Sequence, residues 1–256
     1  MPDRYAVGLR DWSGKEWDFT RNWAAGIKSG GVEDLVGGTV DTTAAPLGSP
    51  GQLVLAQRGD VVTGSVTFHC RAAQGRDAGQ VAADLRRAFS PLIQRRSLLK
   101  VSSPFGVVDT LVRRNGKVPA PVEDPSWDEM VLNLTIPLIS DSGVWYLQAK
   151  KGSGTVGVSN DGDVPLWVSV RWSGAGGVVR LPSQATFTLP PAGAERVLHL
   201  TKMPTVVDAG GKRDDALWSK LRGVMPEMVP VGETREFAVP AGAQVEYRRG
   251  VFDPWQ

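Results

Sequence analysis

Apolar and polar side chains alternate along several short segments of the chain, most clearly at Met130–Leu138. Every second position of this segment is Met, Leu or Ile, and the positions between them hold Val, Asn, Thr and Pro. A period of two places one set of side chains on one face of a β-strand. We therefore predict a core strand here. Its predicted buried residues are Met130, Leu132, Leu134, Ile136 and Leu138.

The chain begins with a pattern that predicts a β-hairpin. Tyr5–Trp12 has strand character, and Ser13-Gly14 supplies a turn. Trp17 and Phe19 follow on the return strand, two residues apart and therefore on one face. Further strands are predicted at Asp60–Cys70, Leu98–Ser102 and Val107–Arg113, the last followed by an Asn115-Gly116 turn that suits antiparallel strands. Residues 41–51 hold two prolines and are predicted to form a loop.

One segment has the pattern of an amphipathic helix. Val81, Leu85 and Phe89 recur at a spacing of four, which aligns them on one helix face. Asp77 precedes them as a candidate N-cap, and Pro91 limits the C-terminal end. We predict a single convincing helix in the first half of the chain, with a shorter one at Asp214–Leu221.

The second half has the pattern of a β-sandwich. Lys150–Gly154 is a short Lys/Gly/Ser stretch and predicts a junction between domains 1–150 and 151–256. Beyond it, Asn160–Asp163 reads as a turn, and short apolar runs are separated by Gly or Pro. The clearest of these runs alternates at Val164, Leu166, Val168, Val170 and Trp172.

Composition supports this β-rich interpretation. The 256 residues suggest two domains, and 30 Gly with 18 Pro suit a turn-rich protein. The formal charge is only +2 and no Lys/Arg block is present, so we expect no nucleic-acid binding. Cys70 is the single cysteine, which excludes an intramolecular disulfide and predicts a small buried side chain. No signal-like start and no long apolar run are visible, so we expect synthesis in the cytoplasm and no membrane insertion.

Catalytic and cofactor motifs are absent from the sequence. Gly152–Gly157 has the spacing G-x-G-x-x-G but leads into a predicted strand, whereas a dinucleotide site needs a following helix. His69 and His199 lie in strand patterns without an H-E-x-x-H partner, and no serine has the glycines of a nucleophile elbow. We therefore expect no enzyme, no cofactor and no metal site.

The nine tryptophans could serve two kinds of surface. Trp172 lies on the apolar face of its strand and is predicted to be core. Trp167 falls on the opposite face, so we expect an exposed ring that contacts either a sugar or a protein partner.

The order of three segments resembles the distal tail (Dit) family of siphophages. Asp11–Phe19 is similar to the opening hairpin of these proteins. The helix at Asp77–Phe89, with strands ending at Ile136–Asp141 and then Trp145-Tyr146, is similar to the way their first domain closes. Val158–Leu166 resembles the start of their galectin-like sandwich.

This resemblance implies a mainly β protein with an N-terminal belt domain and a galectin-like C-terminal β-sandwich. In the family, six copies form a ring at the tail tip of the virion. The ring continues the tail tube, holds the tail-associated hub protein and often holds receptor-binding proteins. The tape measure is a further partner that the resemblance suggests. The family's last strand sometimes returns to the first domain, which would assign Val251–Gln256 there. No long arm insertion is expected from the sequence.

Three hypotheses follow. The first is a structural ring protein in which Trp12, Trp17 and Phe19 help to form the contact between copies. The alternative is a carbohydrate-binding module that recognises host cell-wall polysaccharide, in which weak sites would gain from avidity in a ring. A hydrolase is the third and has no motif behind it.

Overall fold

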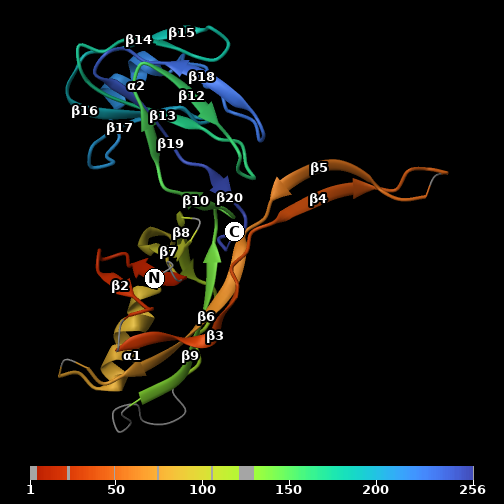
Figure 1. Ribbon diagram of the computed structural model, residues 1–256, viewed down its shortest axis with the longest axis vertical. Helices are drawn as coiled ribbons and strands as arrows, with labels where there is room; N and C mark the ends of the chain where they lie inside the picture. Colours follow the sequence, from red (N-terminus) through yellow and green to blue (C-terminus); the bar gives the residue numbers. More distant parts are fainter. Residues whose placement is uncertain are drawn as a thin grey trace. The chain divides into compact units, whose positions relative to one another are not determined.

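The computed structural model describes residues 5–21, 24–48, 50–73, 75–104, 106–120 and 130–255. The chain is mainly β and divides into two compact units. The first comprises Met1–Tyr146 together with Val251–Gln256, and the second comprises Leu147–Gly250. The last residues of the chain therefore belong to the first unit (Figure 1).

The first unit is built on an antiparallel sheet with the strand order β2-β1-β7-β8-β9-β6-β3. Two short strands extend it, because β10 pairs with β8 and β20 pairs with β10. The bounds are β1 (Ala6–Arg10), β2 (Glu16–Asp18), β3 (Ala25–Asp34), β6 (Val62–Arg71), β7 (Ser97–Ser103), β8 (Gly106–Arg114), β9 (Met130–Ser140), β10 (Trp145–Leu147) and β20 (Gly250–Val251).

Four aromatic rings join the two ends of this sheet in one core. Phe19 follows β2, and its ring centroid lies 4.8 Å from that of Phe68 on β6, in an edge-to-face arrangement. Phe89, at the end of the helix, lies 5.9 Å from Phe68, and Trp17 lies 6.1 Å from Phe19. All four side chains are buried. The sheet therefore folds over on itself around these rings, which bury large apolar areas and favour tilted contacts.

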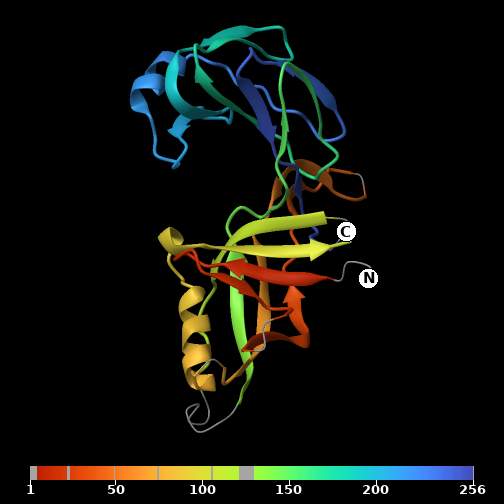
Figure 2. The same ribbon diagram turned by 60° about the vertical axis from the view of Figure 1, so that its left-hand side comes forward.

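The predicted helix is confirmed as α1 (Ala78–Ala88), which packs against β9, β6 and β3 (Figure 2). The Asp77 carboxylate accepts a hydrogen bond from the Gln80 amide, and the Gln80 side chain accepts one from the Asp77 amide. This capping box satisfies two of the amides that a helix start leaves free. Val81 and Leu85 are buried, as their spacing predicted. A 3₁₀ turn, η1 (Ile93–Arg95), follows.

The structure corrects two details of the strand predictions. Leu134, Ile136 and Leu138 are buried on β9, but Leu132 is 57% exposed. The register with β6 shifts between Phe68 and Cys70, and Asn133 adopts a left-handed φ of 56°. This bulge turns Leu132 out of the core. The Asn115-Gly116 pair also does not join neighbouring strands tightly, because β8 ends at Arg114 and β9 begins at Met130.

The predicted loop at 41–51 is wrong for its first part. Residues on both sides of the prolines form an antiparallel hairpin, β4 (Thr39–Ala44) and β5 (Leu53–Gly59). These strands make a separate two-stranded sheet. We call the hairpin from Thr39 to Gly59 the arm, because it extends away from the rest of the first unit (Figure 1, orange). The expectation that the chain has no long arm insertion is therefore wrong.

The second unit has two antiparallel sheets that enclose one apolar core, as the alternating pattern predicted. One has the order β11-β19-β13-β16-β17 and the other β12-β18-β14-β15. The bounds are β11 (Lys150–Gly152), β12 (Thr155–Ser159), β13 (Val168–Gly174), β14 (Gly177–Arg180), β15 (Thr186–Leu189), β16 (Ala192–His199), β17 (Thr205–Asp208), β18 (Thr234–Ala238) and β19 (Ala243–Tyr247).

Trp172 lies in the centre of this second core. Its ring is buried, and its indole N–H donates to the carbonyl of Pro190 over 2.9 Å. Leu166, Val168 and Val170 are buried on the same side of the chain, which confirms most of the predicted alternation. The short helix α2 (Asp215–Leu221) is capped by Asp214 and contacts β17.

Candidate functional site

The turn between β1 and β2 brings Trp12 onto the surface beside the end of α1. The Trp12 indole N–H donates to the carbonyl of Arg87 over 3.0 Å. The guanidinium carbon of Arg95 lies 4.5 Å from the centre of the ring, in a cation–π contact. The ring remains 42% exposed. Trp12 is therefore held in one orientation while it still offers a large surface to a partner.

Asp11 fixes the shape of this turn. Its side chain accepts hydrogen bonds from the Ser13 amide and hydroxyl, from the Lys15 amide and from the Trp17 indole. Burial acts to raise the pKa of Asp11, but these hydrogen bonds favour the ionised form and outweigh it, so the pKa lies below its ordinary value. The buried carboxylate thus connects the exposed turn to the core.

The structure separates the three residues that were predicted to form an interface. Trp17 and Phe19 are only 5% and 3% exposed and belong to the core of the first unit. Neither ring is available to a partner while the unit stays folded. Trp12, of the three, is the residue on the surface. The interface prediction is therefore restricted to Trp12.

The arm carries apolar side chains without burying them. All seven residues of β5 are exposed, and Leu53, Val54 and Leu55 are 56%, 49% and 60% exposed. Leu47, near the tip, and Val40 on β4 are exposed as well. Gln57 donates to Asp41 across the two strands over 2.9 Å. Sequence reasoning missed this element, although two runs with β-branched residues flank a Gly/Pro segment, which is a signal for a hairpin.

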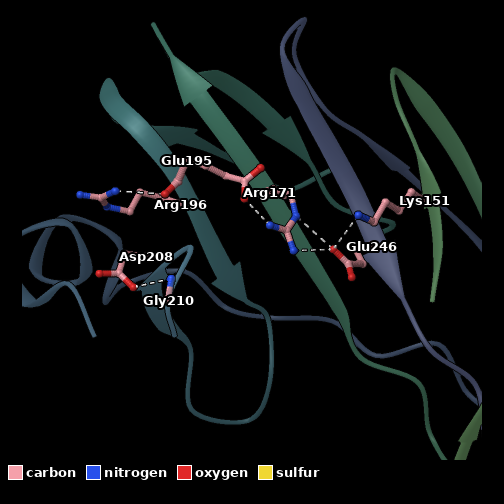
Figure 3. Close-up of polar contacts among 7 residues, drawn as sticks. All are labelled: Lys151, Arg171, Glu195, Arg196, Asp208, Gly210 and Glu246. Carbon is pink, nitrogen blue, oxygen red and sulfur yellow. Dashed lines mark hydrogen bonds and ion pairs between the residues drawn. The ribbon is translucent and has the colours of Figure 1, made fainter. Parts of the chain in front are cut away.

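A row of charged side chains crosses the outer face of the five-stranded sheet in the second unit (Figure 3). Arg171 on β13 donates to Glu246 on β19 over 3.0 Å and also pairs with Glu195 on β16. Lys151 on β11 lies 3.8 Å from the same Glu246 oxygen. The hydrogen bond to Glu246 raises the pKa of Arg171. These groups bind one another and form a ladder across four strands of this sheet.

The other predicted residues have ordinary structural surroundings. Trp167 is half-buried rather than fully exposed. His199 is half-buried, with Nδ1 2.9 Å from the Ser169 hydroxyl, and burial lowers its pKa. His69 accepts a hydrogen bond from the Asn133 amide. Gly152–Gly157 runs from β11 into β12, which is a strand and not the helix that a dinucleotide site requires.

Two further findings concern only the described residues. No group of three or more His, Cys, Asp or Glu side chains is arranged to hold a metal ion. No helix in the described parts of the chain is both long and apolar enough to span a membrane.

Cys70 is fully buried on β6, and burial raises the pKa of its thiol to about 12.

Comparison with known proteins gives matches in structure and not in sequence. No protein-family model matches the chain, and no curated protein matches it. Among solved structures it is similar to the Dit protein of phage SPP1, described as a paradigm of the hub adsorption apparatus in phages that infect Gram-positive bacteria. The TM-score is 0.60 at 8% identity, over 97% of this chain and 99% of that chain.

The chain is also similar to chains of the phage P2 baseplate in its activated conformation. With calcium the TM-score is 0.58, and with strontium it is 0.57. Both matches are at 8% identity and cover 96% of this chain and 98% of the other. The protein therefore has a fold found in phage hub and baseplate proteins. The particular fold is that of Dit, and the resemblance expected from the sequence is confirmed at this level.

Proposed function

We propose that this chain is a structural distal tail protein of a long non-contractile phage tail. Copies of it form a ring that joins the tail tube to the hub and host-recognition apparatus at the tail tip. The match to Dit over nearly the whole length of both chains supports this role.

The exposed apolar arm is the observation that carries the proposal. An isolated two-stranded hairpin is only marginally stable in water. Its free edges and exposed Leu53, Val54 and Leu55 would invite aggregation if they stayed uncovered. Contact with another copy of the chain would cover both the edges and the apolar side chains. The arm is therefore best explained as an assembly element.

A ring needs a heterologous contact, in which one surface of each copy meets a different surface of the next. The arm and the Trp12 turn are two such surfaces on the first unit. A permanent contact of this kind buries on the order of 2,000 Å² or more. We propose six copies, as in the Dit family, with the tail tube protein and the tail-associated hub protein as axial neighbours. Receptor-binding proteins and the tape measure are further proposed partners.

The mass of the purified protein in solution tests the ring. We expect light scattering across concentration to approach about 165 kDa, the mass of six 27.5 kDa chains. Changing Leu53 and Leu55 to Ser should give a folded monomer. The matched control is Val178→Ser in the second unit, because Val178 is 57% exposed and lies outside the arm.

The three possible outcomes distinguish assembly through the arm, assembly through another surface and the absence of a ring. Loss of the large species in the arm variant, with the control unchanged, supports assembly through the arm. Equal masses for the arm variant and the wild type would remove the arm from the contact. A wild-type protein that stays monomeric at every concentration while its thermal unfolding remains cooperative would argue against a ring.

A further inference from the structure

The arm leaves the first unit through a root made of glycines. Gly37 and Gly38 precede β4, and Gly59 ends β5. The Asp60 amide donates to the Gly38 carbonyl over 2.9 Å and closes the base of the hairpin. Glycine leaves the backbone more freedom than any other residue. Without an external brace, the arm could therefore leave the unit in many directions.

Phe252, four residues before the end of the chain, provides a brace on one side of this root. Its carbonyl accepts a hydrogen bond from the Gly37 amide over 2.8 Å. A Cβ placed on Gly37 would lie 2.9 Å from Cδ1 of the Phe252 ring, and one placed on Gly59 would lie 3.8 Å from Cε1. The ring thus lies against both ends of the hairpin. Gly37 is the residue that leaves room for it.

A second brace comes from the segment that leads into β10. The Trp145 indole donates to the Leu35 carbonyl over 2.9 Å, and Leu35 has a left-handed φ of 62°. The Gly143 carbonyl oxygen would lie 2.7 Å from a Cβ on Gly37. The root is therefore held between the 143–145 segment and the returning C-terminal segment.

The C-terminal segment is itself attached to the first unit. Its strand β20 pairs with β10. Pro254 is buried, and the Tyr5 hydroxyl donates to the Trp255 carbonyl over 3.3 Å. The Tyr5 and Trp255 rings lie 6.1 Å apart. The residues before and after Phe252 are thus both held by the first unit. The Phe252 ring therefore has a fixed position, and it restricts the conformations open to the glycines of the root.

We infer that Phe252 is a positioning residue that sets the direction in which the arm leaves the first unit. This inference rests on the proposed function, in which the arm contacts a second copy. An arm held in one direction is already ordered for that contact, so association does not have to order it. Removing the Phe252 ring frees the glycine root and weakens assembly, although Phe252 lies outside the contact surface of the arm.

The experiment measures arm mobility and assembly separately, because the anisotropy is read well below the assembly midpoint, where the arm contacts no second copy. A probe is attached to Leu47→Cys near the arm tip, where the side chain is fully exposed, while Cys70 stays buried and unreactive. We expect Phe252→Ala to lower the fluorescence anisotropy of the probe and to raise the concentration at the assembly midpoint by about tenfold or more. Phe252→Leu should restore most of the wild-type anisotropy and most of the wild-type assembly midpoint. The matched control is Phe187→Ala, which removes a partly buried ring from the second unit.

The outcomes distinguish this inference from the proposed function. If Phe252→Ala changes neither anisotropy nor assembly, with the fold intact by circular dichroism, the inference is wrong. If the arm becomes mobile while the assembly midpoint stays constant, the link to assembly is wrong. If the wild type forms no ring, the proposed function fails, and so does the part of the inference that concerns assembly. The anisotropy still tests whether Phe252 holds the arm. Equal effects of Phe187→Ala would show a general loss of stability.

Discussion

Neighbouring tryptophans of the first hairpin illustrate how burial decides the role of a residue. Trp17 is packed in the core beside Phe19, whereas Trp12 is held on the surface by one hydrogen bond and one cation–π contact. We expect Trp17→Ala to lower the free energy of unfolding by about 3–5 kcal/mol. Trp12→Ala should cost about 1 kcal/mol. Denaturant titration of both variants checks this, and equal losses would contradict the assignment.

Asp11 makes the first unit sensitive to acid. Its pKa is lowered in the folded state, so its ionised form stabilises the fold above the unfolded-state pKa of about 4. That contribution is lost as the pH falls through the lower, folded-state value. We expect the stability of the wild type to fall more steeply below pH 4 than that of Asp11→Asn. Thermal unfolding between pH 7 and pH 2 measures the two slopes, and parallel curves would refute the argument.

Cys70 should be chemically silent in the folded protein. Its thiol is fully buried and has a pKa of about 12, so at pH 8 the thiolate fraction is on the order of one in ten thousand. A thiol reagent such as DTNB should react with less than a tenth of the protein over an hour at pH 8, and with one thiol per chain in guanidinium chloride. Rapid reaction of the native protein would mean that β6 opens.

At the scale of elements, α1 could be predicted because its signals are local. The cap, the spacing of the apolar residues and the limiting proline all lie within one segment. We expect Asp77→Ala to destabilise the first unit by about 1 kcal/mol, because the Gln80 amide loses its acceptor. Asp77→Ser is the control, since serine also caps helices, and should retain most of that stability in the same urea titration.

The arm and the β9 bulge escaped prediction for different reasons: the arm has a local hairpin signal but no buried face, whereas the bulge depends on pairing with β6. Strand patterns report the burial of one face, and neither face of β5 is buried. On β9 a regular alternation continues through Leu132, but the bulge opposite β6 turns that side chain to solvent. Pairing with a strand far away in the sequence decided the outcome on β9. The periodicity of apolar residues shows which residues share a face of a strand, but it does not show which strand lies beside it.

For the whole molecule, the resemblance in segment order indicated the correct fold, whereas the parts of the candidate site remained hidden. The root of the arm joins Gly37 and Gly59 to Phe252, which lies near the other end of the chain. No spacing rule connects these positions. The two tryptophans of the hairpin also differ in burial: Trp17 is buried and donates a hydrogen bond to Asp11, whereas Trp12 is exposed. Sequence thus predicts the kind of protein better than it predicts its contact residues.

The division into two units has an energetic consequence that can be measured. The apolar core of the second unit consists only of residues between Val158 and Val245, so this unit buries its own core. We expect residues 147–250 to fold alone and the full chain to unfold in two calorimetric transitions. In the full chain, Val170→Ala should lower the melting temperature of only one transition, the one that the isolated unit also shows. The free energy of unfolding of that unit should fall by about 2 kcal/mol, because Val170 is fully buried there.

Val81→Ala is the matched variant in the first unit, where Val81 is also fully buried, and it should shift only the other transition. A shared shift would mean that the two units unfold as one. The stability of each unit would then depend on the other. The chain passes between the two units at Tyr146-Leu147 and at Gly250-Val251. In that case removal of the C-terminal residues would destabilise both cores. With independent units, removal would affect only the first unit and its arm, because the segment that returns to the first unit takes no part in the second core.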